Sequence, residues 1–164
     1  MKIRSSALGF TLMELILVIV LLSILSLFAA SRFIGKSSFS AFVLQERVIS
    51  VIRQVQVNRM QSNIDEASLG DDFRLQVSNT CIGSVAACAL SDSQRDSRSD
   101  LVFDPFARFS ITNEVSNPIN FNLLGNPMDS ASGGVSILIE ERNGQSRCAV
   151  EINSQGYVSK GACS

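Results

Sequence analysis

Histidine is absent from the 164 residues of this chain, and neither sign of charge is in excess. Without imidazole, Ser/His/Asp and Cys/His catalytic arrangements and histidine-ligated metal sites are excluded. The 14 Lys and Arg residues stand against 15 Asp and Glu residues, so the chain lacks the basic surplus typical of nucleic-acid-binding proteins. We therefore expect a protein that is not an enzyme, carries no cofactor or metal, and does not bind nucleic acid.

Apolar residues are concentrated near the N-terminus. Between positions 10 and 30, 17 of 21 residues are apolar and Glu14 is the one charge, whereas 54 of the 134 residues from 31 to 164 are apolar. Twenty-one helical residues span about 32 Å, the thickness of a bilayer's hydrocarbon core. Lys2 and Arg4 precede the run, and a short basic flank stays cytoplasmic. The run predicts one membrane crossing, with the body of the chain translocated.

An apolar run near an N-terminus can also be a signal peptide or a plain anchor. A secretory signal peptide has an apolar region of about 7–15 residues and a small-x-small cleavage site. This run is longer, and Phe28 would stand at the third position before a cut after Ala30. A plain anchor that tethers a binding module needs only the length and the basic flank, so it stays open as an alternative.

The residues around the start of the run carry a resemblance. Segment 9–15, with the sequence GFTLMEL, follows a short basic leader and opens the apolar run; it resembles the signature of type IV prepilins and type II secretion pseudopilins. The resemblance implies that a prepilin peptidase removes residues 1–9 by cutting between Gly9 and Phe10, and that the new amine of Phe10 is methylated. It also implies three partners, namely other pilin or pseudopilin subunits, the prepilin peptidase and an inner-membrane assembly platform.

Glu14 is the fifth residue after that cut. An isolated carboxylate costs about 2.5–3.5 kcal/mol at the centre of a bilayer and less near its interface. Two opposite charges about 4 Å apart gain roughly 4 kcal/mol at an effective dielectric constant of 20. We therefore expect Glu14 to pair with the amine of Phe10, in the same chain or in a neighbouring subunit. The alternative is a carboxylate that merely reaches the headgroups or favours the positive start of a helix.

Beyond the run, the pattern stays helical and becomes amphipathic. Residues 31–38 contain weak helix formers, which predicts a bend or partial melting there, although the proline common in pilins is missing. The following helix, from 39 to about 62, has an apolar stripe at spacings of three and four, formed by Ala41, Leu44, Val48, Val51 and Val55. This stripe predicts a helix face that packs on a sheet.

Short alternating runs in residues 63–164 predict strands at 73–77, 108–111, 119–123, 135–139, 148–152 and 157–158. Asn143-Gly144 indicates a tight hairpin. The expected fold class is α+β: a long N-terminal helix, membrane-spanning in its first half and amphipathic in its second, packs on a C-terminal antiparallel β-sheet or small β-sandwich, as in pilins. The expected organisation is a leader at 1–9, a transmembrane and filament-core helix at 10–30, an amphipathic continuation at 31–62 and a periplasmic β-rich head at 63–164.

Two segments refine the resemblance. Segment 119–127 has the pattern I-x-F-x-L-x-G-x-P and precedes a final hairpin, which resembles H-type minor pseudopilins, while segment 32–37 is similar to minor prepilins of the mannose-sensitive haemagglutinin pilus. The expected function is a minor pilin subunit of such a filament, contributing to its biogenesis or to adhesion. The alternatives are an H-type minor pseudopilin of type II secretion and, more remotely, a membrane-tethered periplasmic binding module. The expected location is the inner membrane and then the filament.

Four cysteines in a translocated domain favour disulfides, and three pairings are open. Order along the chain favours Cys81 with Cys88 and Cys148 with Cys163, whose spacings do not match the paired ligands of structural zinc.

The segment 92–100 has an acid at every fourth position, but it lacks the spacing of a calcium loop, and Arg95 and Arg98 stand between the acids. It predicts a solvated loop. A basic patch could form at Arg142, Arg147 and Lys160, but the body has 12 basic and 14 acidic residues, which disfavours binding to nucleic acid.

Overall fold

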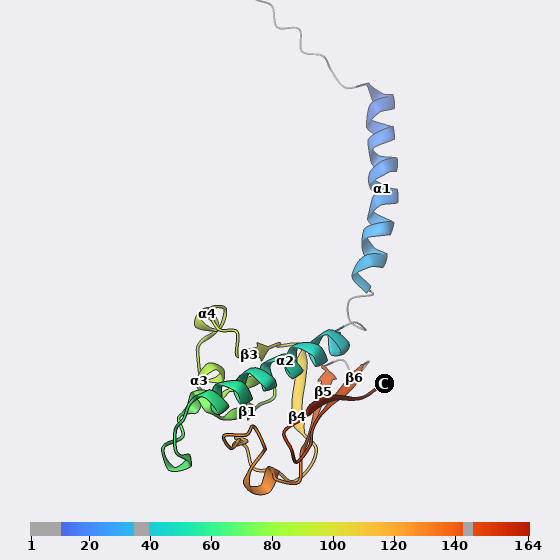
Figure 1. Cartoon of the computed structure of the whole chain (residues 1–164). Helices are drawn as coiled ribbons and strands as arrows, with labels where there is room; N and C mark the ends of the chain where they lie inside the picture. The colour runs from blue at the N-terminus through green and yellow to red at the C-terminus, as the bar shows by residue number, and fades with distance from the viewer. Residues whose placement is uncertain (1–10, 35–39, 143–145) are drawn as a thin grey trace, which may run out of the picture. The chain divides into compact units, whose positions relative to one another are not determined.

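The computed structural model describes residues 11–34, 40–142 and 146–164, with the backbone alone for residues 27–34 and Ser40. The chain divides into two compact units, Met1–Lys36 and Ser37–Ser164. Within the described residues, the first unit contains helix α1, and the second unit, called the head from here on, contains every strand and the other helices (Figure 1).

Helix α1 runs from Leu12 to Ile34. The backbone N–H of Glu14 donates to the side-chain Oγ1 of Thr11 at 3.2 Å. Thr11 therefore caps the helix and Glu14 is its third residue, which is the T-x-x-E pattern of a capping box. The helix thus begins for a local reason that can be read in the sequence.

Two parts of the predicted fold class are wrong. In place of the predicted long N-terminal helix, the structure has two helices: α1 ends at Ile34 and a second helix, α2, begins at Ser40. The predicted bend at 31–38 falls partly on residues 35–39, which lie outside the described residues. Over the described ranges, no helix offers an apolar length sufficient for a membrane crossing. This finding contradicts the predicted transmembrane helix at 10–30 and the single-pass inner-membrane location with a periplasmic head.

Helix α2, Ser40–Gln61, is the amphipathic helix expected from the sequence. All five residues of the predicted apolar stripe are buried, and Glu46, Arg47 and Ser50 on the other side are exposed. The helix packs on strands of both sheets of the head (Figure 1). Burial of this stripe is what stabilises α2, since most helical stability in proteins comes from packing an apolar face.

The head has two antiparallel sheets. The first has the order β1 (Leu75–Val77), β2 (Cys81–Ser84) and β3 (Leu101–Phe103), and the second has the order β4 (Ala107–Ile111), β5 (Val135–Glu141), β6 (Arg147–Ile152) and β7 (Val158–Cys163). In β5 every second residue is buried from Val135 to Glu141, which is the alternation of a sheet with one face on the core. Short helices and 3₁₀ turns connect the strands: η1 (Glu66–Ser68), η2 (Asp71–Phe73), α3 (Val85–Cys88), α4 (Asp92–Arg95) and η3 (Asp129–Ala131).

The expected strand at 119–123 is the main difference in the sheets. Ile119 forms an isolated bridge with Leu75, and Phe121 forms another with Pro127. The chain turns immediately afterwards, because the side-chain Oδ1 of Asn122 accepts the backbone N–H groups of Leu124 and Asn126. Asn143 and Gly144 lie outside the described residues, between strands β5 and β6, which pair antiparallel.

One hydrophobic core joins the two sheets through α2. It includes Val48 and Ile52 from the helix, Ile82 from the first sheet, and Ile137 and Val150 from the second, all with no exposed surface. A smaller cluster around Cys81, Ala87 and Leu101 lies under the short helices.

Candidate functional site

The described surface of α1 is apolar on all sides. Every large apolar side chain from Leu12 to Leu25 is 43–76% exposed. These exposed side chains lie all around α1, whereas the buried side chains of α2 lie on one side of that helix. One strip forms a shallow hollow of about 370 Å³, lined by Met13, Ile16, Leu17, Val20 and Leu21. A helix that is apolar all round is normally covered by other apolar surface.

The hydroxyl groups on α1 are compatible with packing of this helix against an apolar surface. The Oγ of Ser23 donates to the carbonyl oxygen of Ile19, and the Oγ of Ser26 donates to that of Leu22, both at 2.7 Å. Because each hydroxyl is satisfied within the helix, packing against an apolar partner would leave neither donor unpaired. Among the described side chains of α1, Glu14 is then the one charged group, and it is exposed.

The predicted processing site falls at the edge of the described structure. Gly9 and Phe10 lie outside the described residues, and Glu14 lies within them. The structure brings Glu14 next to Thr11, an arrangement that was not predicted although the T-x-x-E pattern signals it. Cleavage, methylation of Phe10 and pairing of Glu14 with its amine stay predictions.

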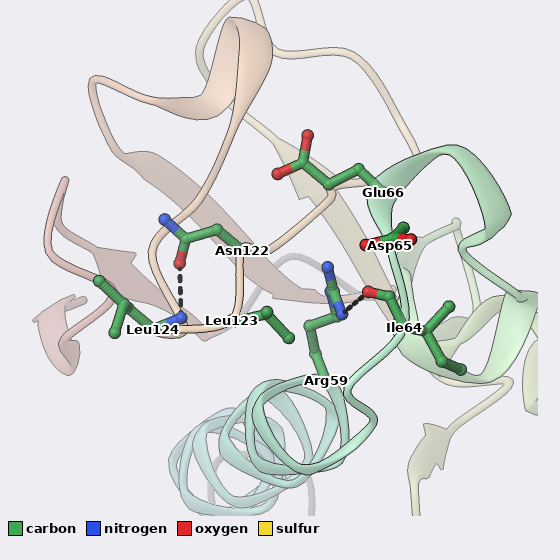
Figure 2. Close-up of a pocket in the computed structure, with 7 residues that line it drawn as sticks. All are labelled: Arg59, Ile64, Asp65, Glu66, Asn122, Leu123 and Leu124. Carbon is green, nitrogen blue, oxygen red and sulfur yellow. Dashed lines mark hydrogen bonds between the residues drawn. The ribbon is translucent and has the colours of Figure 1, made fainter.

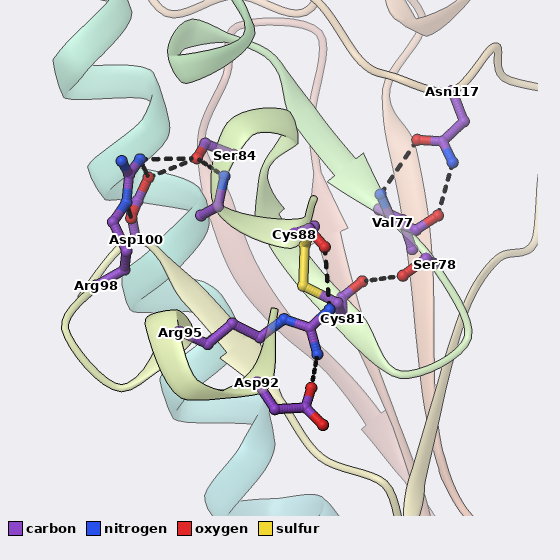
Figure 3. The surroundings of a disulfide bond; sticks show 11 residues. Val77, Ser78, Cys81, Ser84, Cys88, Asp92, Arg95, Arg98, Asp100 and Asn117 are labelled. Carbon is purple, nitrogen blue, oxygen red and sulfur yellow. Dashed lines mark hydrogen bonds and ion pairs between the residues drawn. A yellow bond between two sulfur atoms is a disulfide. The ribbon is translucent and has the colours of Figure 1, made fainter. Parts of the chain in front are cut away.

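The cysteines are paired as order along the chain favoured. Cys81 and Cys88 form a disulfide that ties strand β2 to the end of α3 (Figure 3). Cys148 and Cys163 form a second one between directly opposite residues of β6 and β7. The second bond holds the end of the last strand on its neighbour.

A polar cluster lies beside the first disulfide. Asp100, 6% exposed, accepts hydrogen bonds from Arg98 Nε and Nη2, both at 2.7 Å, and from Ser84 Oγ at 2.5 Å (Figure 3). Arg98 Nη2 also pairs with Asp72 at 2.9 Å. Burial raises the pKa of Asp100, but the hydrogen bonds from Arg98 and Ser84 and the charge of Arg98 outweigh it and hold that pKa below its ordinary value. Hydrogen bonds to Asp100 and then Asp72 raise the pKa of Arg98.

The other arginine of this loop also engages an acid. Arg95 Nη1 lies 2.7 Å from Asp92, and its guanidinium stacks 4.4 Å from the centre of the Phe103 ring. In the part of the chain that the structure describes, no group of three or more potential metal-ligating side chains lies close enough together to hold a metal ion. The segment 92–100 contains the helical turn α4 and is held by ion pairs within it and by the pair between Arg98 and Asp72.

The candidate basic patch is partly engaged with neighbouring groups. Lys160 forms an ion pair with Glu46 of α2, and Arg147 Nε donates to Ser164 Oγ at 2.9 Å. Arg142 is exposed. The geometry gives these three residues no common site.

Three buried polar side chains of α2 were not predicted from the sequence. Gln45, Gln56 and Arg59 are 6% exposed or less. With Ile49 and Ile52 they form a second stripe at spacings of three and four, next to the predicted one. Their polar types concealed this spacing. Each donates to backbone carbonyl oxygens of the head. Gln45 donates to those of Ala149 and Gly161. Gln56 donates to those of Gly125 and Gly156, and Arg59 donates to that of Phe121.

Comparisons of the chain with protein-family models, with curated proteins and with solved structures find no match.

Proposed function

We propose that this chain is a minor subunit of a type IV pilus-like filament, which assembles by packing α1 against the corresponding helices of other subunits. The observation that carries the proposal is the surface of α1, apolar and exposed on every described side. The signature-like segment at 9–15 supports it.

Glu14 is the group that would fix the register of packed helices. It is the one charge on the described surface of α1, and a carboxylate covered by apolar helices is costly unless it is paired with a cation. The proposed cation is the amine of Phe10, exposed by cleavage after Gly9. A neighbouring helix that is shifted along α1 would leave both charges unpaired, so one register is favoured.

The substitution Glu14→Gln tests this role. Glutamine at the third helical position preserves the capping box with Thr11, so it removes the charge while leaving the start of the helix intact. We expect the amount of subunit in sheared, sedimented filaments to fall at least about tenfold, because a factor of ten corresponds to about 1.4 kcal/mol and an unpaired buried charge costs more. Immunoblotting of filament and cell fractions measures it.

Glu46→Gln provides the matched control, since Glu46 is an exposed carboxylate on α2 and its loss should leave incorporation unchanged. Mass spectrometry of the wild-type N-terminus should find a chain that begins at Phe10 with a methylated amine. Incorporation of Glu14→Gln at the level of Glu46→Gln, or an uncut chain in the filament fraction, would show the proposal to be wrong.

A further inference from the structure

The cationic side chain of Arg59 is buried without an acidic partner. It is 1% exposed, and its Nε and Nη1 donate to Phe121 O, Ser62 Oγ and Ile64 O at 2.8–2.9 Å. Within the described residues, no carboxylate lies within 4.0 Å of it. These acceptors satisfy hydrogen bonds but leave the charge itself uncompensated, which is costly at a buried position.

The remaining nitrogen, Nη2, faces a cavity. It donates to no acceptor in the described part of the chain. Among the described residues, the one side-chain nitrogen or oxygen that is both fully buried and without a hydrogen-bond partner is Arg95 Nε. Nη2 is therefore not fully enclosed. Arg59 lines a cavity of about 500 Å³, a volume within the range of small-molecule sites. Figure 2 shows its guanidinium reaching into this cavity from α2.

The walls of the cavity differ in character. Leu123 and Leu124 form an apolar wall on one side of Arg59, and Ile64 lies on the opposite side, next to Asp65 (Figure 2). Leu124 is 74% exposed. The other side carries the carboxylates of Asp65 and Glu66, which lie above the guanidinium in Figure 2 and are exposed. The cavity thus presents one buried cation, two exposed carboxylates and an apolar wall.

We infer that this cavity binds an apolar α-amino acid in its zwitterionic form. A simple anion would meet Arg59 but be repelled by Asp65 and Glu66, and a simple amine would leave Arg59 uncompensated. A zwitterion satisfies both: its carboxylate accepts from Arg59 Nη2, and its ammonium group faces the two acids. Its side chain packs on Leu123 and Leu124. The cavity lies wholly in the head, so the inference does not rest on the filament proposal.

Isothermal titration calorimetry of the full chain tests the charge requirement with three ligands of one shape. They are L-leucine, 4-methylpentanoate, which lacks the ammonium group, and 3-methylbutylamine, which lacks the carboxylate. We expect leucine to bind at least about tenfold more tightly than either analogue, because a site built for polar groups rejects a ligand that leaves them unpaired. No detectable binding of leucine, or equal binding of an analogue, would overturn the inference.

Arg59 is part of the core, so a substitution there would disturb the fold as well as the cavity. The test variants are therefore made at exposed residues. In Asp65→Asn/Glu66→Gln we expect leucine to bind at least about fivefold more weakly and 4-methylpentanoate more tightly than in wild type, because the acids hold the ammonium group and repel a lone carboxylate. Leu124→Ser should weaken leucine binding because it removes part of the apolar wall. Glu114→Gln, an exposed acid outside the cavity, is the matched control and should change neither ligand.

Two results would contradict this assignment of the acids. If leucine bound the double variant more tightly, Asp65 and Glu66 would be competing for Arg59 rather than holding the ammonium group. If the double variant matched Glu114→Gln with both ligands, the acids would play no part in binding. Circular dichroism of every variant establishes that the head is folded in each titration.

Discussion

Asp100 is an acid whose ionised form is stabilised by its surroundings in the folded chain. Its pKa is held below the ordinary value, so the folded state binds the proton more weakly than the unfolded state does. The stabilisation is therefore complete above the unfolded pKa of about 3.9. It is lost as the pH falls through the lower, folded-state pKa. Acid should loosen the contact between the loop at 98–100, strand β2 and Asp72.

The substitution Asp100→Asn should lower the free energy of unfolding at pH 7 by about 2 kcal/mol, the magnitude of a hydrogen bond to a charged partner. It should also flatten the decline of stability below about pH 4, because the titrating group is gone. Chemical denaturation at several pH values between about 2.5 and 7 measures both effects. Asp96→Asn, an exposed acid of the same segment, is the control. A variant whose stability fell with acid as steeply as wild type would contradict this role for Asp100.

The sequence indicates part of this cluster. Arg95 and Arg98 stand among acids of the same segment, so local neutralisation could be predicted, and both arginines do pair with acids. Ser84 and Asp72 could not be predicted as partners, because their contacts with segment 98–100 depend on how β2 and η2 pack. The same limit hides Arg59, whose acceptors include a carbonyl 62 positions away.

At the scale of elements, strands β2 and β3 approach each other closely at one glycine. Gly83 of β2 is opposite Leu101 of β3. A Cβ atom at Gly83 would lie 2.6 Å from the Cα of Leu101 and would overlap the carbonyl oxygen of Asp100. Both obstacles are backbone, which cannot move aside as a side chain can, so the pairing of these strands requires glycine here.

Gly83→Ala should therefore destabilise the head by at least about 2 kcal/mol, since excess volume at a close-packed site forces backbone shifts. Gly133→Ala is the matched control: a Cβ there meets nothing within 4 Å, and the substitution should be neutral or stabilise by up to about 1 kcal/mol. Thermal and urea unfolding of the two variants compare them. Equal stabilities would mean that β2 and β3 are not this close.

Elements whose hydrophobic pattern continues over many residues were predictable from the sequence, and the shortest elements were not. The stripe of α2 repeats over five positions from Ala41 to Val55, and β5 alternates over seven residues, so each carries its own signal. Strands β2 and β3 have four and three residues with little alternation, because nearly all of them are buried. Segment 119–123 does alternate, yet the turn at Asn122 limits it to isolated bridges.

At the scale of the whole molecule, the chain consists of two units that differ in how their apolar surface is buried. The head has its own core, built from α2 and both sheets, and two disulfides. The described part of α1 has no core of its own and exposes apolar surface throughout. The two units should therefore behave independently in folding, with association confined to the first.

A chain that begins at Ser37 tests this independence. We expect it to unfold cooperatively with a midpoint within about 3 °C of that of the full chain, a shift that corresponds to less than about 1 kcal/mol for a domain of this size. We also expect it to sediment as a monomer, while the full chain associates. Calorimetry and analytical ultracentrifugation give the two readouts. Loss of the cooperative transition would show that the head depends on α1.

The polar side chains on the buried side of α2 have a consequence for how this chain can diverge. Gln45 and Gln56 donate to main-chain oxygens, and every residue type offers such an oxygen. The identity of Ala149, for example, is not specified by the hydrogen bond it accepts. Substitutions at such positions can accumulate without loss of these anchors, whereas Gly125 and Gly156, whose carbonyl oxygens accept from Gln56, have positive φ and must stay glycine. Homologous heads should then share the glutamines of the helix while their loop sequences drift apart.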